Sequence, residues 1–140
     1  SGEIDVMEYY QDKILANVFW GKNDPGTPDQ WVANGVVSEH RLDSWAPDFF
    51  DGTWHTWRLF WNHDRVQVYL DDRVLLDEPT AQFVNPNSGS NPLKAPHRIR
   101  LNVAVGGQAG GTPRTQEDES RMEVHALRIW CNPRYFCHQV

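Results

Sequence analysis

The stretch EIDVMEYY, residues 3–10, alternates polar and apolar side chains with the period of a β-strand. Strict alternation places Glu3 and Asp5 on one face and sends Glu8 to the opposite, apolar face. An ionised carboxylate in an apolar core is very costly. We therefore expect one extra residue, a β-bulge at Val6-Met7, that returns Glu8 to the face of Glu3 and Asp5. The sequence thus predicts three carboxylates on one face of a single strand.

Strand patterns also dominate the rest of the chain, and loops rich in Gly, Pro, Asn and Asp separate them. No segment has the period of a long helix. Many short strands joined by turns are typical of an all-β sandwich or jelly roll, and no domain boundary is evident. The expected strands cover residues 3–10, 14–20, 36–42, 54–62, 65–71, 73–77, 98–105 and 121–130.

Composition excludes several classes of protein. The net charge of −6 over 140 residues disfavours a nucleic-acid partner, because phosphate contacts need clustered Lys and Arg. No apolar run approaches the roughly 20 residues that span a bilayer, so no membrane partner is expected. Seven Trp residues are more than a small core needs, and some are expected to form platforms for sugar rings.

Two cysteines, Cys131 and Cys137, stand near the end of the chain. Two free thiols and a small disulfide loop are both compatible with this spacing, and we favour the disulfide. A disulfide implies an oxidising compartment, so we expect a secreted, extracellular or periplasmic protein. A metal site would need more partners than the nearby His138 supplies.

The three carboxylates on one strand have three interpretations. Cross-strand basic partners would make them structural, but residues 14–20 offer none. A metal site needs oxygens around one point, whereas a strand spreads them along a line. The third interpretation is glycoside hydrolysis: Glu3 and Glu8 lie four strand steps apart, roughly 13 Å between Cα atoms. On a concave sheet their carboxyl groups could converge to the retaining separation of about 5–5.5 Å.

This interpretation gives each carboxylate a role. Glu3 is the expected nucleophile and Glu8 the expected general acid/base. Asp5 lies between them, where it can orient Glu3 and, by like charge, keep Glu8 protonated enough to act as an acid.

The motif GEIDVME, residues 2–8, resembles the bulged Glu-x-Asp-x-x-Glu signature of glycoside hydrolase family 16, in its laminarinase- and agarase-like form. The resemblance continues in order through residues 55–61, 66–74, 96–107 and 121–130. It implies a jelly-roll β-sandwich (concanavalin A-like) with a concave glycan cleft. It also implies retaining endo-hydrolysis of a β-linked polysaccharide, with Glu3, Asp5 and Glu8 in the roles given above.

The chain departs from the family pattern in the position of its catalytic strand. The catalytic strand lies near the middle of the family domain but begins here at residue 3. We therefore expect residues 1–140 to be the C-terminal portion of one catalytic domain, incomplete at its N-terminus. An N-terminal segment or a second copy of the chain would complete it.

Individual residues depart from the pattern as well. Phe19 stands where many members carry a His, and Gln108-Ala109 stand where members often have Asn-Trp. His125 replaces an Asp that often serves a structural calcium ion, so we expect no cofactor and do not favour calcium.

The expected ligand is a polysaccharide, most simply a β-1,3- or β-1,3-1,4-glucan. The alternatives are hydrolysis of an algal galactan (agar, porphyran or carrageenan) and a jelly roll that binds glycan without cutting it. His55 and His97 are expected to be structural, and core packing is expected for at least one of Trp57 and Trp61. The expected substrate-binding residues are Asn17, Trp20, Trp31, Asn102 and Gln108.

Overall fold

The computed structural model describes residues 2–22, 32–85, 88–106, 112 and 121–131. The chain divides into two compact units, residues 1–99 and 100–140. Each unit is described by itself below.

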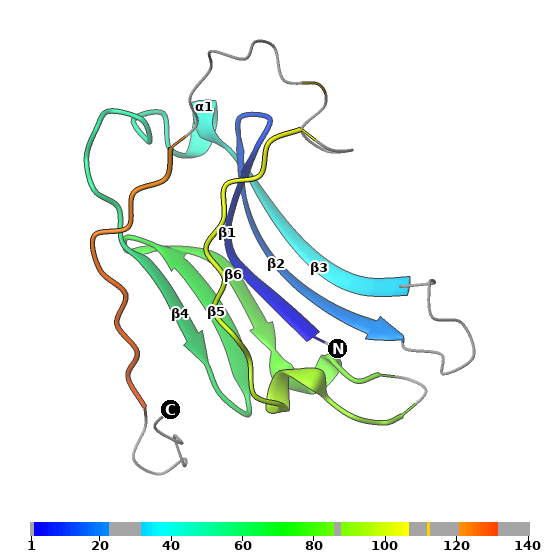
Figure 1. Ribbon diagram of the computed structural model, residues 1–140. Coiled ribbons are helices and arrows are strands. Elements are labelled where there is room, and N and C mark those ends of the chain that lie inside the picture. The colour runs from blue at the N-terminus through cyan, green and yellow to red at the C-terminus, as the bar shows by residue number, and fades with distance from the viewer. Residues whose placement is uncertain (1, 23–31, 86–87, 107–111, 113–120, 132–140) are drawn as a thin grey trace. The chain divides into compact units, whose positions relative to one another are not determined.

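The first unit contains two antiparallel sheets of three strands each (Figure 1). One sheet has the order β1 (Gly2–Tyr10), β2 (Lys13–Lys22), β3 (Val32–Arg41), and the other β4 (Trp57–Trp61), β5 (Arg65–Leu70), β6 (Arg73–Pro79). The β1–β2 turn has two residues, Gln11 and Asp12, with φ of 49° and 59°, which is the left-handed geometry of a tight hairpin. Among the described residues of this unit, helical structure is limited to three short segments: α1 (Leu42–Trp45), η1 (Thr80–Gln82) and η2 (Pro92–Lys94).

The inner faces of the two sheets share one hydrophobic core. Ile14, Ala16 and Val18 of β2 and Val66, Val68 and Leu70 of β5 are all buried in it. Trp57 and Trp61 pack against this core, as expected from their strand. The all-β sandwich expected from the sequence is therefore confirmed.

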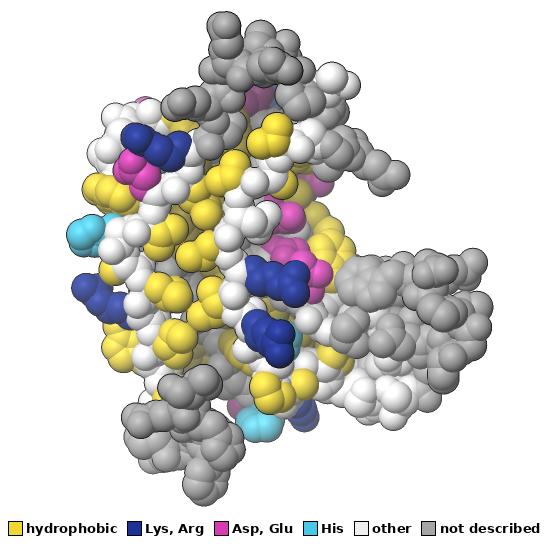
Figure 2. All heavy atoms as spheres, viewed as in Figure 1, with side chains coloured by type: hydrophobic (Ala, Val, Ile, Leu, Met, Phe, Trp, Pro, Cys, Tyr) yellow, Lys and Arg dark blue, Asp and Glu magenta, His cyan; other side chains and the backbone are white. Residues whose placement is uncertain are grey.

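Two expected strands are not part of any sheet. Residues 98–105 and 121–130 form no ladder with any described residue. Alternation of apolar residues marks a possible face, but a strand also needs a neighbour to accept and donate its backbone hydrogen bonds. The apolar side chains of these segments are exposed instead: Val105 by 69%, Ile129 by 70% and Trp130 by 81%. Hydrophobic side chains are visible at the surface in the space-filling view (Figure 2).

Other boundaries also differ from expectation. The strand expected at residues 36–42 is β3, which begins earlier, at Val32. Residues 42–45, expected at the end of that strand and in a loop, form the single turn of α1. Among the described residues, no helix has the length and apolar character needed to span a bilayer.

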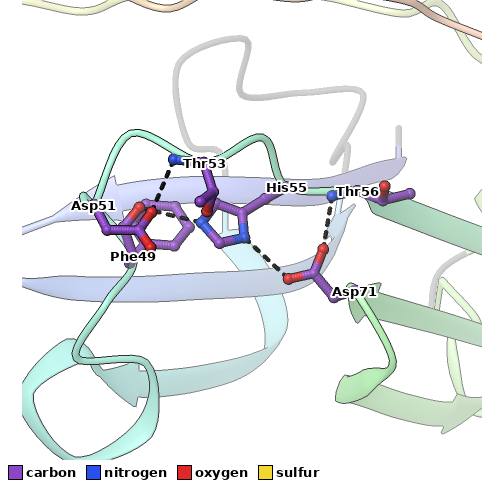
Figure 3. A network of polar contacts seen from close by, with 6 residues as sticks. All are labelled: Phe49, Asp51, Thr53, His55, Thr56 and Asp71. Carbon is purple, nitrogen blue, oxygen red and sulfur yellow. Dashed lines mark hydrogen bonds and ion pairs between the residues drawn. The ribbon is translucent and has the colours of Figure 1, made fainter.

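The loop before β4 is fastened to the β5–β6 turn by His55 (Figure 3). Its Nδ1 lies 2.9 Å from the Asp71 carboxylate and its Nε2 lies 3.2 Å from the Phe49 carbonyl oxygen. Asp71 also accepts a hydrogen bond from the Thr56 amide at 2.8 Å. Partial burial acts to raise the pKa of Asp71, but the Thr56 amide and His55 together hold it below its usual value. This network and the contact of His97 with the Pro92 carbonyl confirm structural roles for both histidines.

Candidate active site

The predicted β-bulge is present in β1. Asp5 pairs with Asn17 and Glu8 pairs with Leu15, so the register shifts by one residue between Asp5 and Glu8. Glu3 pairs with Phe19, which places Glu3 and Glu8 four steps apart along β2. The bulge therefore returns Glu8 to the face of Glu3 and Asp5, as the cost of burying a carboxylate requires.

The three carboxylates face away from the core. Ile4 and Val6 of the same strand pack against the core cluster, whereas Glu3 and Glu8 are exposed and Asp5 is half-buried. This arrangement gives one surface of the β1–β2–β3 sheet a row of acids with its central member partly withdrawn from water.

Asn17 connects two of the carboxylates. It is 2% exposed and stands opposite Asp5 on the neighbouring strand. Its Nδ2 donates to Glu8 Oε2 at 2.5 Å and to Asp5 Oδ2 at 3.4 Å. Its Oδ1 is buried and has no hydrogen-bond partner among the described residues. Asn17 was expected to contact substrate, but its contacts in the structure are with the candidate catalytic groups.

Asp5 holds its proton to an unusually high pH. Burial is the largest cause, followed by the negative charges of Glu8 and Glu3, and together they raise its pKa to about 7. The hydrogen bond from Asn17 opposes this shift without overcoming it. We expected the charge of Asp5 to act on Glu8. In the structure the charge of Glu8 raises the pKa of Asp5, second to burial, and Asp5 is the more buried of the two.

Phe19 is an aromatic residue of this face that was not among the expected substrate contacts. It pairs with Glu3 on one side and with Gly35 of β3 on the other. A β-carbon added to Gly35 would collide with the Phe19 ring, so the ring occupies the space above that glycine. An isolated Gly inside a strand, as in VANGVVS, often marks such a close approach and was the available signal.

Trp20 requires a correction. It lies on the core side of β2, where it packs against the buried cluster and meets the Phe83 ring edge-on at a centroid distance of 5.0 Å. Successive residues of a strand point to opposite faces, so Trp20 and the carboxylates cannot share one. The expected sugar contact by Trp20 is therefore not supported.

The remaining expected contacts, Trp31, Asn102 and Gln108, lie outside the described part of the first unit. Asn102 belongs to the second unit and is exposed there. Trp31 and Gln108 lie outside the described residues, as does Cys137, so the disulfide and the location that it implies stay predictions. Within the described part of the chain, no group of three or more His, Cys, Asp or Glu residues could hold a metal ion.

Comparison with known proteins identifies distant homologues that act on or bind β-1,3-glucan. The chain is 26% identical over 140 residues to glucan endo-1,3-beta-glucosidase A1 of Niallia circulans, covering 93% of this chain and 19% of that protein. It is 31% identical over 142 residues to glucan endo-1,3-beta-glucosidase of Cryptopygus antarcticus, covering 93% and 49%. It is 30% identical over 130 residues to beta-1,3-glucan-binding protein of Penaeus monodon, covering 81% and 35%. No protein-family model matches the chain.

These similarities relate the chain to proteins that hydrolyse or bind β-1,3-glucan, and they do not distinguish hydrolysis from binding. The chain spans between 19% and 49% of the length of these relatives. Two of the three are named as glucanases and one as a binding protein, so the homologues share a β-1,3-glucan ligand rather than one activity.

Proposed function

We propose that this chain is the carboxylate-bearing part of a family 16 retaining endo-β-glucanase, acting on β-1,3-glucan or mixed β-1,3-1,4-glucan. The observation that carries the proposal is the bulged β1 strand, which places Glu3, Asp5 and Glu8 on one face. A protein that only binds sugar has no need for two exposed carboxylates on either side of a third that is half-buried. The relatives named as glucan endo-1,3-beta-glucosidases support the choice of substrate.

The proposed reaction has two steps. In the first, Glu8 gives its proton to the glycosidic oxygen while the Glu3 carboxylate attacks the anomeric carbon, which forms a glycosyl ester and releases the leaving chain. In the second, Glu8 takes a proton from water, and the resulting hydroxide displaces Glu3 from the anomeric carbon.

Asp5 supports both steps through its proton. Because its pKa is near 7, Asp5 is about half protonated at neutral pH, and the protonated form can donate a hydrogen bond to Glu3. This reduces the negative charge between the two glutamates and orients the nucleophile without adding a cation.

Glycan binding without cleavage is the second candidate, and the similarity to beta-1,3-glucan-binding protein favours it. The two candidates are distinguished by incubating the protein with laminarin, lichenan, agar and carrageenan and measuring new reducing ends. Glu3→Gln serves as the control for cleavage. New reducing ends that are lost in Glu3→Gln support the glucanase. Retention of laminarin by both proteins without new reducing ends supports the binding protein, and cleavage of agar or carrageenan alone points to a galactan hydrolase.

A further inference from the structure

Asn17 has a contact whose length is unusual for an amide nitrogen. The atom placed as Nδ2 lies 2.5 Å from Glu8 Oε2. Hydrogen bonds from N–H to oxygen usually measure about 2.7–3.2 Å, whereas those from O–H to oxygen extend down to about 2.5 Å. The separation therefore suits a carboxylic acid that donates to an amide oxygen as well as an amide that donates to a carboxylate.

The other end of the same amide is unsatisfied. Asn17 Oδ1 is buried without a partner among the described residues, although a buried carbonyl oxygen normally accepts a hydrogen bond. Rotation of the amide by half a turn exchanges its oxygen and nitrogen with almost no change in shape. The oxygen would then face Glu8 and Asp5, and it could accept a hydrogen bond from the O–H group of either carboxyl in its protonated form.

We propose that Asn17 is a positioning residue whose amide turns over as Glu8 gains and loses its proton. When Glu8 is ionised, the Asn17 NH₂ group donates to it. When Glu8 is protonated, Glu8 donates to the Asn17 carbonyl. No proton passes to Asn17, whose amide supplies a hydrogen-bond donor to the ionised carboxylate and an acceptor to the protonated carboxyl. This inference concerns the site of the proposed function and deepens it, since a general acid/base must be held in both protonation states.

The surroundings of the amide suit such a role. Lys13, Glu39, Arg41 and Tyr10 are the other titratable side chains that the strand register places on this face, beside Glu3 and Asp5. Lys13 is bonded to Glu39 at 2.7 Å and Arg41 to Asp43 at 3.0 Å. These ion pairs occupy both cations, and the side chain that bonds Glu8 is the neutral amide of Asn17. A cation in that place would favour the ionised form of Glu8, whereas an amide can bond both forms.

The first test does not depend on catalysis. NMR follows the side-chain NH₂ signals of Asn17 while the pH of a solution of the whole chain is varied. These signals are assigned by their loss in Asn17→Leu. The titration is run on Asp5→Asn, because Asn17 also contacts the Asp5 carboxyl, which titrates near pH 7. In that variant we expect the signals to shift in one step together with the Glu8 carboxyl carbon, and that step to disappear in Asp5→Asn/Glu8→Gln. Signals of Asp5→Asn that ignore pH, or a step that survives in the double variant, would overturn the proposal.

The second test uses turnover and applies once hydrolysis is established. Asn17→Leu should lower kcat by at least about tenfold with little change in KM. Asn17→Asp keeps the shape of the side chain. Its kcat should recover only at acid pH, where the new carboxyl is protonated and can both donate and accept a hydrogen bond. Asn85→Leu is the matched control, because Asn85 is also buried (6% exposed) but donates to the Gly21 carbonyl.

The two tests separate the inference from the proposed function. A wild-type chain that never cleaves glucan contradicts the glucanase, whereas the NMR titration still decides the behaviour of Asn17. Equal loss of kcat in Asn17→Leu and Asn85→Leu, or an Asn17→Asp variant as slow at acid pH as at neutral pH, would contradict the positioning role.

Discussion

Replacing Asp5 by Asn should make the protein more stable at alkaline pH and leave its stability unchanged at acid pH. The pKa of Asp5 rises from 3.8 to about 7 on folding, chiefly through burial and then through the charges of Glu8 and Glu3. Below about pH 4 the residue is protonated in both the folded and unfolded states. Between about pH 4 and 7 unfolding releases a proton, so the free energy of unfolding falls as the pH rises. Above about pH 7 the full free-energy cost of keeping Asp5 ionised in the folded state is present.

The size of the effect follows from the same shift. Three pH units correspond to about 4 kcal/mol at most, since one unit is about 1.4 kcal/mol. Asp5 is only half-buried, so solvent screening reduces the expected cost to about 1–2 kcal/mol. Asn has the shape of Asp without the charge, and Asp5→Asn removes this cost.

The assay is urea unfolding of the wild-type chain and Asp5→Asn from pH 4 to pH 8. We expect the gain in free energy of unfolding to grow with pH to about 1–2 kcal/mol at pH 8. Asp51→Asn is the control of opposite sign. Hydrogen bonds from the Thr53 hydroxyl and amide lower the pKa of Asp51, so this variant should be less stable than the wild type by an amount that stays constant from pH 4 to pH 8 and is lost only at lower pH. A difference between wild type and Asp5→Asn that does not change with pH would refute the electrostatic account of the three carboxylates.

Three further predictions concern catalysis, packing and assembly. Glu3→Gln should lower turnover by about a thousandfold or more while the unfolding curve and glucan binding stay unchanged; near-normal turnover would show that Glu3 is not the nucleophile. Gly35→Ala should destabilise the fold by about 1–3 kcal/mol because a β-carbon there collides with the Phe19 ring. The double variant Gly35→Ala/Phe19→Ala should lose less than the sum of the single changes, and strict additivity would exclude the contact. Residues 1–140 should associate with a second copy in solution, because the exposed apolar side chains of residues 98–105 and 121–130 need partner strands; light scattering that finds a monodisperse monomer would contradict this.

The carboxylate strand could be predicted from the sequence because its determinants are local. Alternation fixes which residues of β1 share a face, and the cost of a buried Glu8 requires one extra residue at the observed position. The expected strands 3–10 and 14–20 leave only the short polar stretch 11–13 between them, and this local feature also predicts the β1–β2 hairpin.

The contacts across strands could not be predicted in this way. The bonds from Asn17 to Glu8 and Asp5 depend on the register between β1 and β2, which the sequence of either strand does not state. Trp20 was expected to contact sugar because it lies near the loop that follows the β1–β2 hairpin, but position along a strand does not state which face a side chain takes. Residues 98–105 illustrate a second limit, because their pattern is that of a strand but pairing is decided by a neighbour elsewhere.

The central claim, that Glu3 and Glu8 carry out retaining hydrolysis of β-glucan, is tested most directly by the stereochemistry of the first product. Laminarin is incubated with the protein, and the new anomeric signals are followed by proton NMR before mutarotation equilibrates them. The proposed double displacement predicts that the β-anomer appears first and the α-anomer only later. Initial appearance of the α-anomer would contradict the account, and so would the absence of cleavage by a protein that holds all three carboxylates intact.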